Sequence, residues 1–130
     1  MNGMSADDFL WVIQRNVILD LAEKGPCVIV GRCADYILKE RADCLNVFVH
    51  ADADIRAERI VRLYGESEKS PLKRLEEKDK KRSVYYRYYT GREWGMAANY
   101  HIALNGGKLG LERGVELIAE LTEIQKALTS

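Results

Sequence analysis

The sequence has no excess charge of either sign, and its other scarce features exclude several classes of protein. Twenty Lys and Arg residues balance twenty Asp and Glu residues over 130 positions, so no overall positive field draws the chain to DNA or to an anionic membrane. No apolar run approaches the roughly 20 residues that a membrane-spanning helix needs. The first residues also lack the basic start and apolar stretch of a signal peptide.

Cysteine and histidine are scarce, so the chain has few of the side chains that usually bind zinc. The three cysteines, Cys27, Cys33 and Cys44, show no C-x-x-C spacing, and there are only two histidines. This pattern argues against zinc, and we predict no metal site formed by the chain's own side chains. An odd number of cysteines is typical of reduced thiols, so the sequence favours a cytoplasmic location.

The sequence contains no phosphate-binding loop of the G-x-x-x-x-G-K-[ST] type. Gly106-Gly107-Lys108 has no glycine five residues before Gly107 and no Ser or Thr after the lysine. The stretch from Gly25 to Gly31 carries a β-branched run in its middle, which predicts a strand rather than a loop that surrounds phosphates.

Short apolar strands alternate with amphipathic helices along the chain. Ser5 is expected to cap a first helix that Gly25-Pro26 ends. Its apolar residues recur at spacings of three and four, which places them on one face of the helix: Leu10, Ile13, Val17 and Leu21. Strands are expected at Cys27–Val30, Leu45–His50 and Tyr100–Leu104. This order predicts an α/β fold, with a mainly parallel sheet of three strands and helices on both of its faces.

A long helix is expected from Pro71 to Tyr89, with proline at its first position and Gly91 beyond its end. One face of this helix carries a stripe at spacings of three and four: Leu72, Leu75, Asp79, Arg82, Tyr86 and Tyr89. The charged pair in the stripe has two interpretations. Asp79 and Arg82 form a structural ion pair at the edge of the core, or the carboxylate orients the guanidinium toward a bound phosphate.

The stretch from Lys78 to Gly95 combines six basic residues with four tyrosines. Glu76, Glu77 and Asp79 interrupt the positive charge, which argues against binding of double-stranded nucleic acid. Single-stranded RNA could stack on the tyrosines. Adjacent tyrosines of a helix are expected to point in different directions, however, and so to form no single platform.

Three further arginines are candidates for phosphate binding. Arg32 follows the first expected strand, and α/β sheets place ligand groups at the carboxyl ends of strands. The alternative interpretation of Arg32 is a surface salt bridge. Arg56 and Arg59 lie on the helix expected after the second strand, where their spacing alone is typical of a solvated face.

Four segments resemble the cytidylate kinase-like family, a branch of the P-loop nucleoside monophosphate kinases. They are CVIVGRCADYIL, VFVHADADIRAERI, the span from Asp79 through YYRYYTGREWG, and YHIALNGGKLGLERGVELI. The segments occur in the family's order and extend roughly from Leu21 to Glu120. The resemblance implies phosphoryl transfer from ATP, with Mg²⁺, to a nucleoside monophosphate such as CMP. It also implies a mobile segment, the LID, over the phosphates.

The resemblance implies roles for single residues. Arg32 matches the strand-end arginine that holds the monophosphate substrate. Asp79 and Arg82 match the D-x-x-R pair of the LID, which would span about residues 66–95, and whose arginine leans over the transferred phosphate. Arg56 and Arg59 match the R-A-x-R of the preceding helix, where an arginine covers the base or the phosphates of ATP.

The chain departs from the family's pattern at three places. Ile29 stands where cytidylate kinases carry an acid that helps to read cytosine, and Leu75 stands where an additional LID arginine is expected. Family members also begin with a strand, a phosphate loop and a monophosphate-binding region, and these do not precede the first matching segment here. We therefore expect residues 1–130 to form a single partial domain, an incomplete P-loop kinase fold that is truncated and inactive by itself.

The expected partners are a nucleoside monophosphate and ATP, with no DNA and no membrane. A missing central strand would leave unpaired sheet edges, which favour a homodimer or an exchange of elements between chains. The alternative function is a noncatalytic nucleotide-binding or protein-interaction module. A single-stranded RNA binder ranks third.

Overall fold

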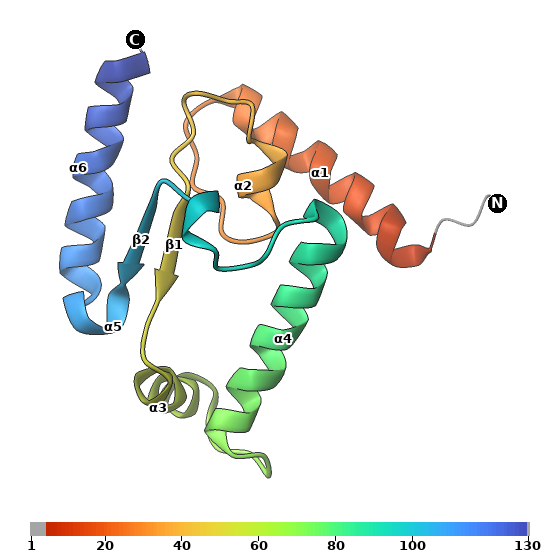
Figure 1. Ribbon diagram of the computed structural model, residues 1–130, viewed down its shortest axis with the longest axis vertical. Helices are drawn as coiled ribbons and strands as arrows, with labels where there is room; N and C mark the ends of the chain where they lie inside the picture. Colours follow the sequence, from red (N-terminus) through yellow and green to blue (C-terminus); the bar gives the residue numbers. More distant parts are fainter. Residues whose placement is uncertain (1–4, 130) are drawn as a thin grey trace. The chain divides into compact units, whose positions relative to one another are not determined.

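A computed structural model describes residues 5–129, which form two units (Figure 1). The first unit ends at Cys44 and the second begins at Leu45. The first unit contains helices α1 (Ala6–Lys24) and α2 (Ala34–Ile37). The second unit contains, in chain order, β1 (Val47–His50), α3 (Ala53–Tyr64), α4 (Pro71–Thr90), the 3₁₀ turn η1 (Ala97–Asn99), β2 (Ile102–Asn105), α5 (Gly106–Leu109) and α6 (Leu111–Thr129).

The core of the first unit lies between α1 and α2. Ser5 starts α1 as predicted, because its Oγ accepts a hydrogen bond from the backbone N–H of Asp8 at 3.1 Å. Ile18 of α1 packs with Ala34 and Leu38, and all three are buried. Half-buried apolar residues surround them: Leu19, Ala22, Ile29, Ile37 and Cys44.

The apolar face predicted for α1 forms on the helix but is not buried. Its four residues are 44% to 60% exposed: Leu10, Ile13, Val17 and Leu21. Ile18, one residue beyond Val17, is buried instead. The apolar stripe predicted from the periodicity exists, but no described residue covers it.

The sheet has two strands, not the expected three. β1 and β2 are parallel and in register from the Val47–Ile102 pair to the His50–Asn105 pair. A parallel pair needs a crossover, which α3 and α4 supply here, so the α/β class is confirmed.

The predicted strand at Cys27–Val30 is not formed. Val28 and Val30 are 92% and 85% exposed, and no strand of residues 5–129 pairs with this segment. An extended segment becomes part of a sheet only beside a partner edge, however strong its β propensity. The missing partner is therefore the physical reason for the difference.

The long helix α4 forms as predicted. Ser70 caps it, because its Oγ accepts a hydrogen bond from the backbone N–H of Lys73 at 3.3 Å. Pro71 occupies the first turn, and Gly91 ends the helix in the left-handed region, with φ of 70°. No helix within residues 5–129 has the length and apolar character needed to cross a membrane.

The chain returns from α4 to the sheet through aromatic contacts. The ring of Phe48 on β1 meets the rings of Trp94 and Tyr100, with centroids 5.5 Å and 4.9 Å apart. Helices α3 and α4 pack against each other, and α5 lies against both strands (Figure 1). The α3–α4 pair is therefore tied to the sheet at both ends, by the short connection from β1 and by Trp94.

Candidate functional site

The charged groups of α3 and α4 meet at Asp79. Arg56, in the first turn of α3, donates two hydrogen bonds to this carboxylate, from Nη1 to Oδ2 at 2.7 Å and from Nη2 to Oδ1 at 2.8 Å. Arg82, one turn after Asp79 on α4, donates from Nη1 to Oδ1 at 3.0 Å. One carboxylate thus holds two guanidinium groups from two helices. We refer to these three residues as the arginine cluster.

Helix packing explains why these side chains meet. Ile60 lies one turn after Arg56 on α3, and Leu75 lies one turn before Asp79 on α4. Both aliphatic residues are buried. Because residues four apart share a helix face, the buried positions carry the two charged side chains toward the side on which α3 and α4 pack.

Asp79 is the most enclosed member of the arginine cluster. Its side chain is 28% exposed, compared with 32% for Arg56 and 53% for Arg82. Hydrogen bonds from Arg56 hold the pKa of Asp79 below its usual range, and Arg82 adds to this effect, although partial burial acts in the opposite direction. The contact with Asp79 also raises the pKa of Arg56. Asp79 and Arg56 are therefore both charged at neutral pH.

The structure separates the two arginines of α3. The interpretation of Arg56 as part of a solvated face is wrong, because its side chain is half-buried and paired with Asp79. Arg59, one turn later, is exposed and makes no hydrogen bond or ion pair with the described residues. The expected contact between Asp79 and Arg82 is present, but the spacing within α4 alone does not reveal Arg56 as the bidentate partner of Asp79.

A second tie joins the two helices at their connecting loop. Arg74, in the first turn of α4, donates from Nη1 to the backbone carbonyl of Gly65 at 2.8 Å. Glu77 accepts hydrogen bonds from Lys69 Nζ at 3.0 Å and 2.8 Å. The loop between α3 and α4 is thus attached to the start of α4 by two basic side chains.

Arg32 belongs to the first unit, outside the arginine cluster's unit. It lies in a turn where three successive residues have left-handed backbone: Gly31 with φ of 69°, Arg32 with 59° and Cys33 with 58°. Non-glycine residues pay about 1–3 kcal/mol each for such conformations. The Arg32 carbonyl accepts a hydrogen bond from Gln14 Nε2 at 3.3 Å. Its side chain is exposed, and the salt bridge proposed as its alternative role is absent among the described residues.

The cysteines show no feature of a reactive or metal-binding site. None of them is in a disulfide within the described chain. Burial, with a smaller effect from the charge of Asp35, raises the pKa of the Cys33 thiol to about 11, and a protonated thiol is a poor nucleophile. In residues 5–129, no three His, Cys, Asp or Glu side chains lie together as a metal site requires.

Three of the four α4 tyrosines contact one another, but their ring planes are inclined by 54° and 80°, so they form no single flat platform, as predicted. The ring centroids of Tyr85 and Tyr89 are 4.7 Å apart, and those of Tyr88 and Tyr89 are 4.8 Å apart. Tyr86 is buried instead, with 4% of its surface exposed. Tyr85 and Tyr89 share a helix face, whereas side-chain torsions bring Tyr88 and Tyr89 together although their Cα positions differ by a step of about 100°. We call Tyr85, Tyr88 and Tyr89 the tyrosine cluster.

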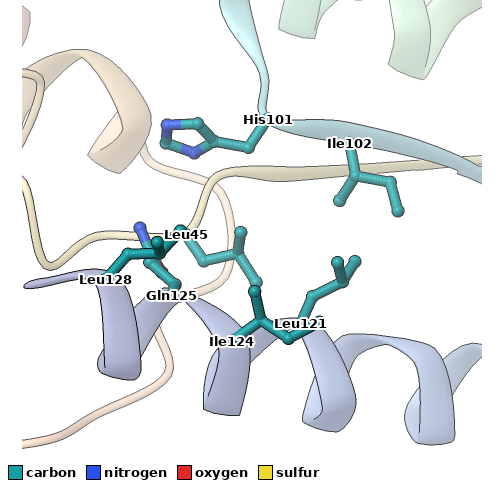
Figure 2. Close-up of a pocket in the computed structure, with 7 residues that line it drawn as sticks. All are labelled: Leu45, His101, Ile102, Leu121, Ile124, Gln125 and Leu128. Atoms are coloured by element: carbon teal, nitrogen blue, oxygen red, sulfur yellow. The ribbon is translucent and has the colours of Figure 1, made fainter.

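An apolar hollow of about 240 Å³ lies beside α6 (Figure 2). Leu121 and Ile124 rise from α6 toward Ile102 at the start of β2. The other lining residues are Leu45, His101, Gln125 and Leu128. This lining includes no Lys or Arg and none of the predicted site residues, so the hollow is a gap in the packing of α6 and not a phosphate site.

Comparison with known proteins decides the family. A model of the cytidylate kinase-like family matches residues 1–108. The chain belongs to the cytidylate kinase-like family. The fold is similar to the crystal structure of an uncharacterized protein from Eubacterium ventriosum ATCC 27560, with a TM-score of 0.84 and 30% sequence identity. The match covers 92% of this chain and 68% of that chain. No curated protein matches this member of the family, and the family itself indicates a kinase-like domain.

We predict that Asp79→Asn lowers the free energy of unfolding by about 1–2 kcal/mol at pH 7, because a neutral amide cannot serve two guanidinium groups. Since the folded-state pKa of Asp79 is lowered, the stabilisation is fully present above about pH 4, the usual range of the group. It is lost as the pH falls further. Urea unfolding of both proteins between pH 3 and pH 7 measures the difference, which should shrink at the acid end.

Glu77→Gln is the matched control. Glu77 also accepts hydrogen bonds from a basic side chain, but it and its partner Lys69 are 45% and 57% exposed. Water therefore screens this pair more strongly, and the change at pH 7 should be smaller than for Asp79→Asn. Equal effects of the two substitutions would show that the arginine cluster contributes no more than an ordinary surface pair.

Proposed function

We propose that this chain takes part in phosphoryl transfer from ATP to a nucleoside monophosphate, either CMP or a similar nucleotide. The observation that supports this most directly is the convergence of two guanidinium groups, from separate helices, on one anionic group. Carboxylates and phosphates offer similar oxygen pairs to a guanidinium. Donors arranged around the Asp79 carboxylate are therefore also suited to phosphate oxygens nearby.

The charge of the arginine cluster favours an additional anion. Two guanidinium groups and one carboxylate leave a net positive charge in a partly enclosed position. A guanidinium has five N–H donors, and Arg82 uses one of them on Asp79. In the proposed reaction, Arg82 stabilises the charge that spreads over the transferred phosphate. Asp79 is a positioning residue that orients Arg82, and Arg56 anchors Asp79.

Arg32 and Arg59 are proposed as further nucleotide contacts. Both side chains are exposed and make no ion pair with the described residues. Strained backbone such as that of Arg32 often occurs at ligand sites, and we assign Arg32 to the phosphate of the acceptor nucleotide. Arg59 lies one turn beyond Arg56 on α3, and we assign it to ATP. These roles rest on the family resemblance together with the accessibility of the two side chains.

ATP would act with Mg²⁺ in this proposal. Mg²⁺ is generally held by substrate phosphates and one or two carboxylates. The arginine cluster fits the phosphate part of such a ligand. Asp79 is already shared by two arginines, so we assign it no role as a metal ligand. The LID would comprise about residues 66–95 of a single partial domain in the cytoplasm.

A second candidate is a noncatalytic nucleotide-binding module. The observation that favours it is the absence of G-x-x-x-x-G-K-[ST] from the 130 residues. Backbone N–H groups of that loop hold the phosphates of ATP in P-loop proteins. Residues 1–130 alone are therefore proposed to bind nucleotide without turnover, as part of an incomplete P-loop kinase fold.

Calorimetric titration with ATP tests the nucleotide site. Loss of a charge-assisted hydrogen bond is worth about 1.5–3 kcal/mol, so we predict that Arg82→Ala weakens binding at least tenfold. Arg82→Lys should fall between the two proteins, because it keeps the charge without the fork of donors. The 130-residue chain is expected to show no ATP-dependent phosphorylation of CMP.

Arg113→Ala is the matched control, since Arg113 is an exposed arginine on α6, whereas the arginine cluster is formed by α3 and α4. Its ATP affinity should equal that of the unchanged chain. An Arg82→Ala protein that binds ATP with unchanged affinity would refute the proposed site. Turnover of CMP by residues 1–130 would instead refute the noncatalytic behaviour proposed for these residues, and would leave the site intact.

We also propose that the first unit associates with a second copy of the chain. Its exposed apolar residues include Leu10, Val17, Val28 and Val30, and an extended segment without a strand partner invites pairing. Analytical ultracentrifugation is expected to show a species heavier than the 14.8 kDa monomer. Val28→Lys combined with Val30→Lys should reduce its amount, whereas Val84→Lys, on an exposed residue of α4, should not. A monomer at all concentrations would contradict this proposal.

A further inference from the structure

The tyrosine cluster presents aromatic surface to solvent. Tyr85 and Tyr89 are half-buried, and Tyr88 has 70% of its surface exposed. Contacts with Tyr89 hold the two other rings in place. The cluster is therefore a supported group of rings with one ring facing outward, and not a set of independent side chains.

The tyrosine cluster lies in a stretch rich in basic residues, bounded by Asp79 and Glu93, although the whole chain has no net charge. Residues 80–92 include five basic residues and no acid: Lys80, Lys81, Arg82, Arg87 and Arg92. The acid just before this stretch, Asp79, is already engaged by two arginines. Lys81 lies one turn before Tyr85, on the same side of α4. Positive charge and exposed aromatic surface therefore coincide at the C-terminal half of α4.

We propose that this half of α4 binds single-stranded nucleic acid, with a base stacked on the exposed ring of Tyr88 and phosphates on the surrounding basic residues other than Arg82. Every base has a flat face, so stacking on aromatic rings tolerates any sequence, and cationic grooves that follow the backbone accompany it in known single-strand binders. Duplexes keep their base faces inside the stack and offer them to no tyrosine. The outward ring of Tyr88 thus selects single strands over duplexes.

This surface differs from the proposed nucleotide site. Its recognition uses the tyrosine cluster, which has no role in the transfer of a phosphate from ATP. The two proposals therefore fail separately: ATP binding depends on the arginine cluster, and oligonucleotide binding depends on Tyr88.

Fluorescence anisotropy with labelled 12-nucleotide oligo(U) and oligo(dT) tests the proposal, using the full 130-residue chain at low salt. Single-strand sites generally cover about 4–16 nucleotides, and each stacked base contributes about 5- to 150-fold to affinity. We expect Tyr88→Ala to weaken binding at least fivefold and Tyr88→Phe to preserve it. A preference for oligo(U) would show contact with the 2′-hydroxyl, and equal binding would show recognition of base faces and phosphates alone; either supports the proposal.

Tyr64→Ala is the matched control. Tyr64 is 69% exposed, almost the same as Tyr88, and lies outside the tyrosine cluster at the end of α3. Its substitution should change oligonucleotide affinity by less than about twofold. Circular dichroism of each variant checks that α4 remains folded.

The salt dependence provides a second, independent readout. Binding should weaken steeply with salt, and Lys81→Ala should reduce the logarithmic slope by about 0.7 for the single phosphate contact it removes. No binding at low salt, unchanged affinity in Tyr88→Ala, or equal affinity for a duplex of the same length would each overturn the proposal.

Discussion

The bidentate contact between Arg56 and Asp79 is the interaction on which the candidate site depends. It joins α3 to α4 across the loop that connects them, at 2.7 Å and 2.8 Å. By fixing the Asp79 carboxylate, it also fixes the partner of Arg82. Helix α4 therefore carries Arg82 in a defined position relative to α3, because Asp79 holds both guanidinium groups.

The same contact leaves a local positive charge in a chain that has no net charge. Asp79 neutralises only one of its two guanidinium partners, so a positive charge remains where solvent is partly excluded. An anion beside Arg82 can accept hydrogen bonds from the N–H groups that do not bind Asp79. The hydrogen bond between Arg82 and Asp79 is then kept. The proposed role in phosphoryl transfer depends on this arrangement, because donors that are already in place stabilise developing negative charge.

Short sequence patterns predicted the features that interactions between neighbouring residues determine. Ser70, Pro71 and Gly91 set the ends of α4, and four short segments indicated the family that residues 1–108 match. Tertiary partners decided the rest. The Cys27–Val30 segment has strand propensity but no partner edge, and the convergence of Tyr88 with Tyr89 depends on side-chain torsions that the helix period does not specify.

One pattern in the sequence is consistent with the pairing of Arg56 with Asp79. Each residue lies four positions from a buried aliphatic residue, Ile60 on α3 and Leu75 on α4. In two helices joined by a short loop, such positions face each other. A search for opposite charges beside the apolar stripes of consecutive helices would have found this pair, whereas the search within one helix found only Asp79 and Arg82.

NMR spectroscopy of the arginine side chains tests the central claim most directly. The Nε–Hε signals of Arg56 and Arg82 should both shift as ATP is added, because the bound phosphates join the arginine cluster. Arg41, which pairs with Asp43 and Glu23 in the first unit, should not move. Saturation with ATP that leaves the Arg56 and Arg82 signals unchanged would contradict the account.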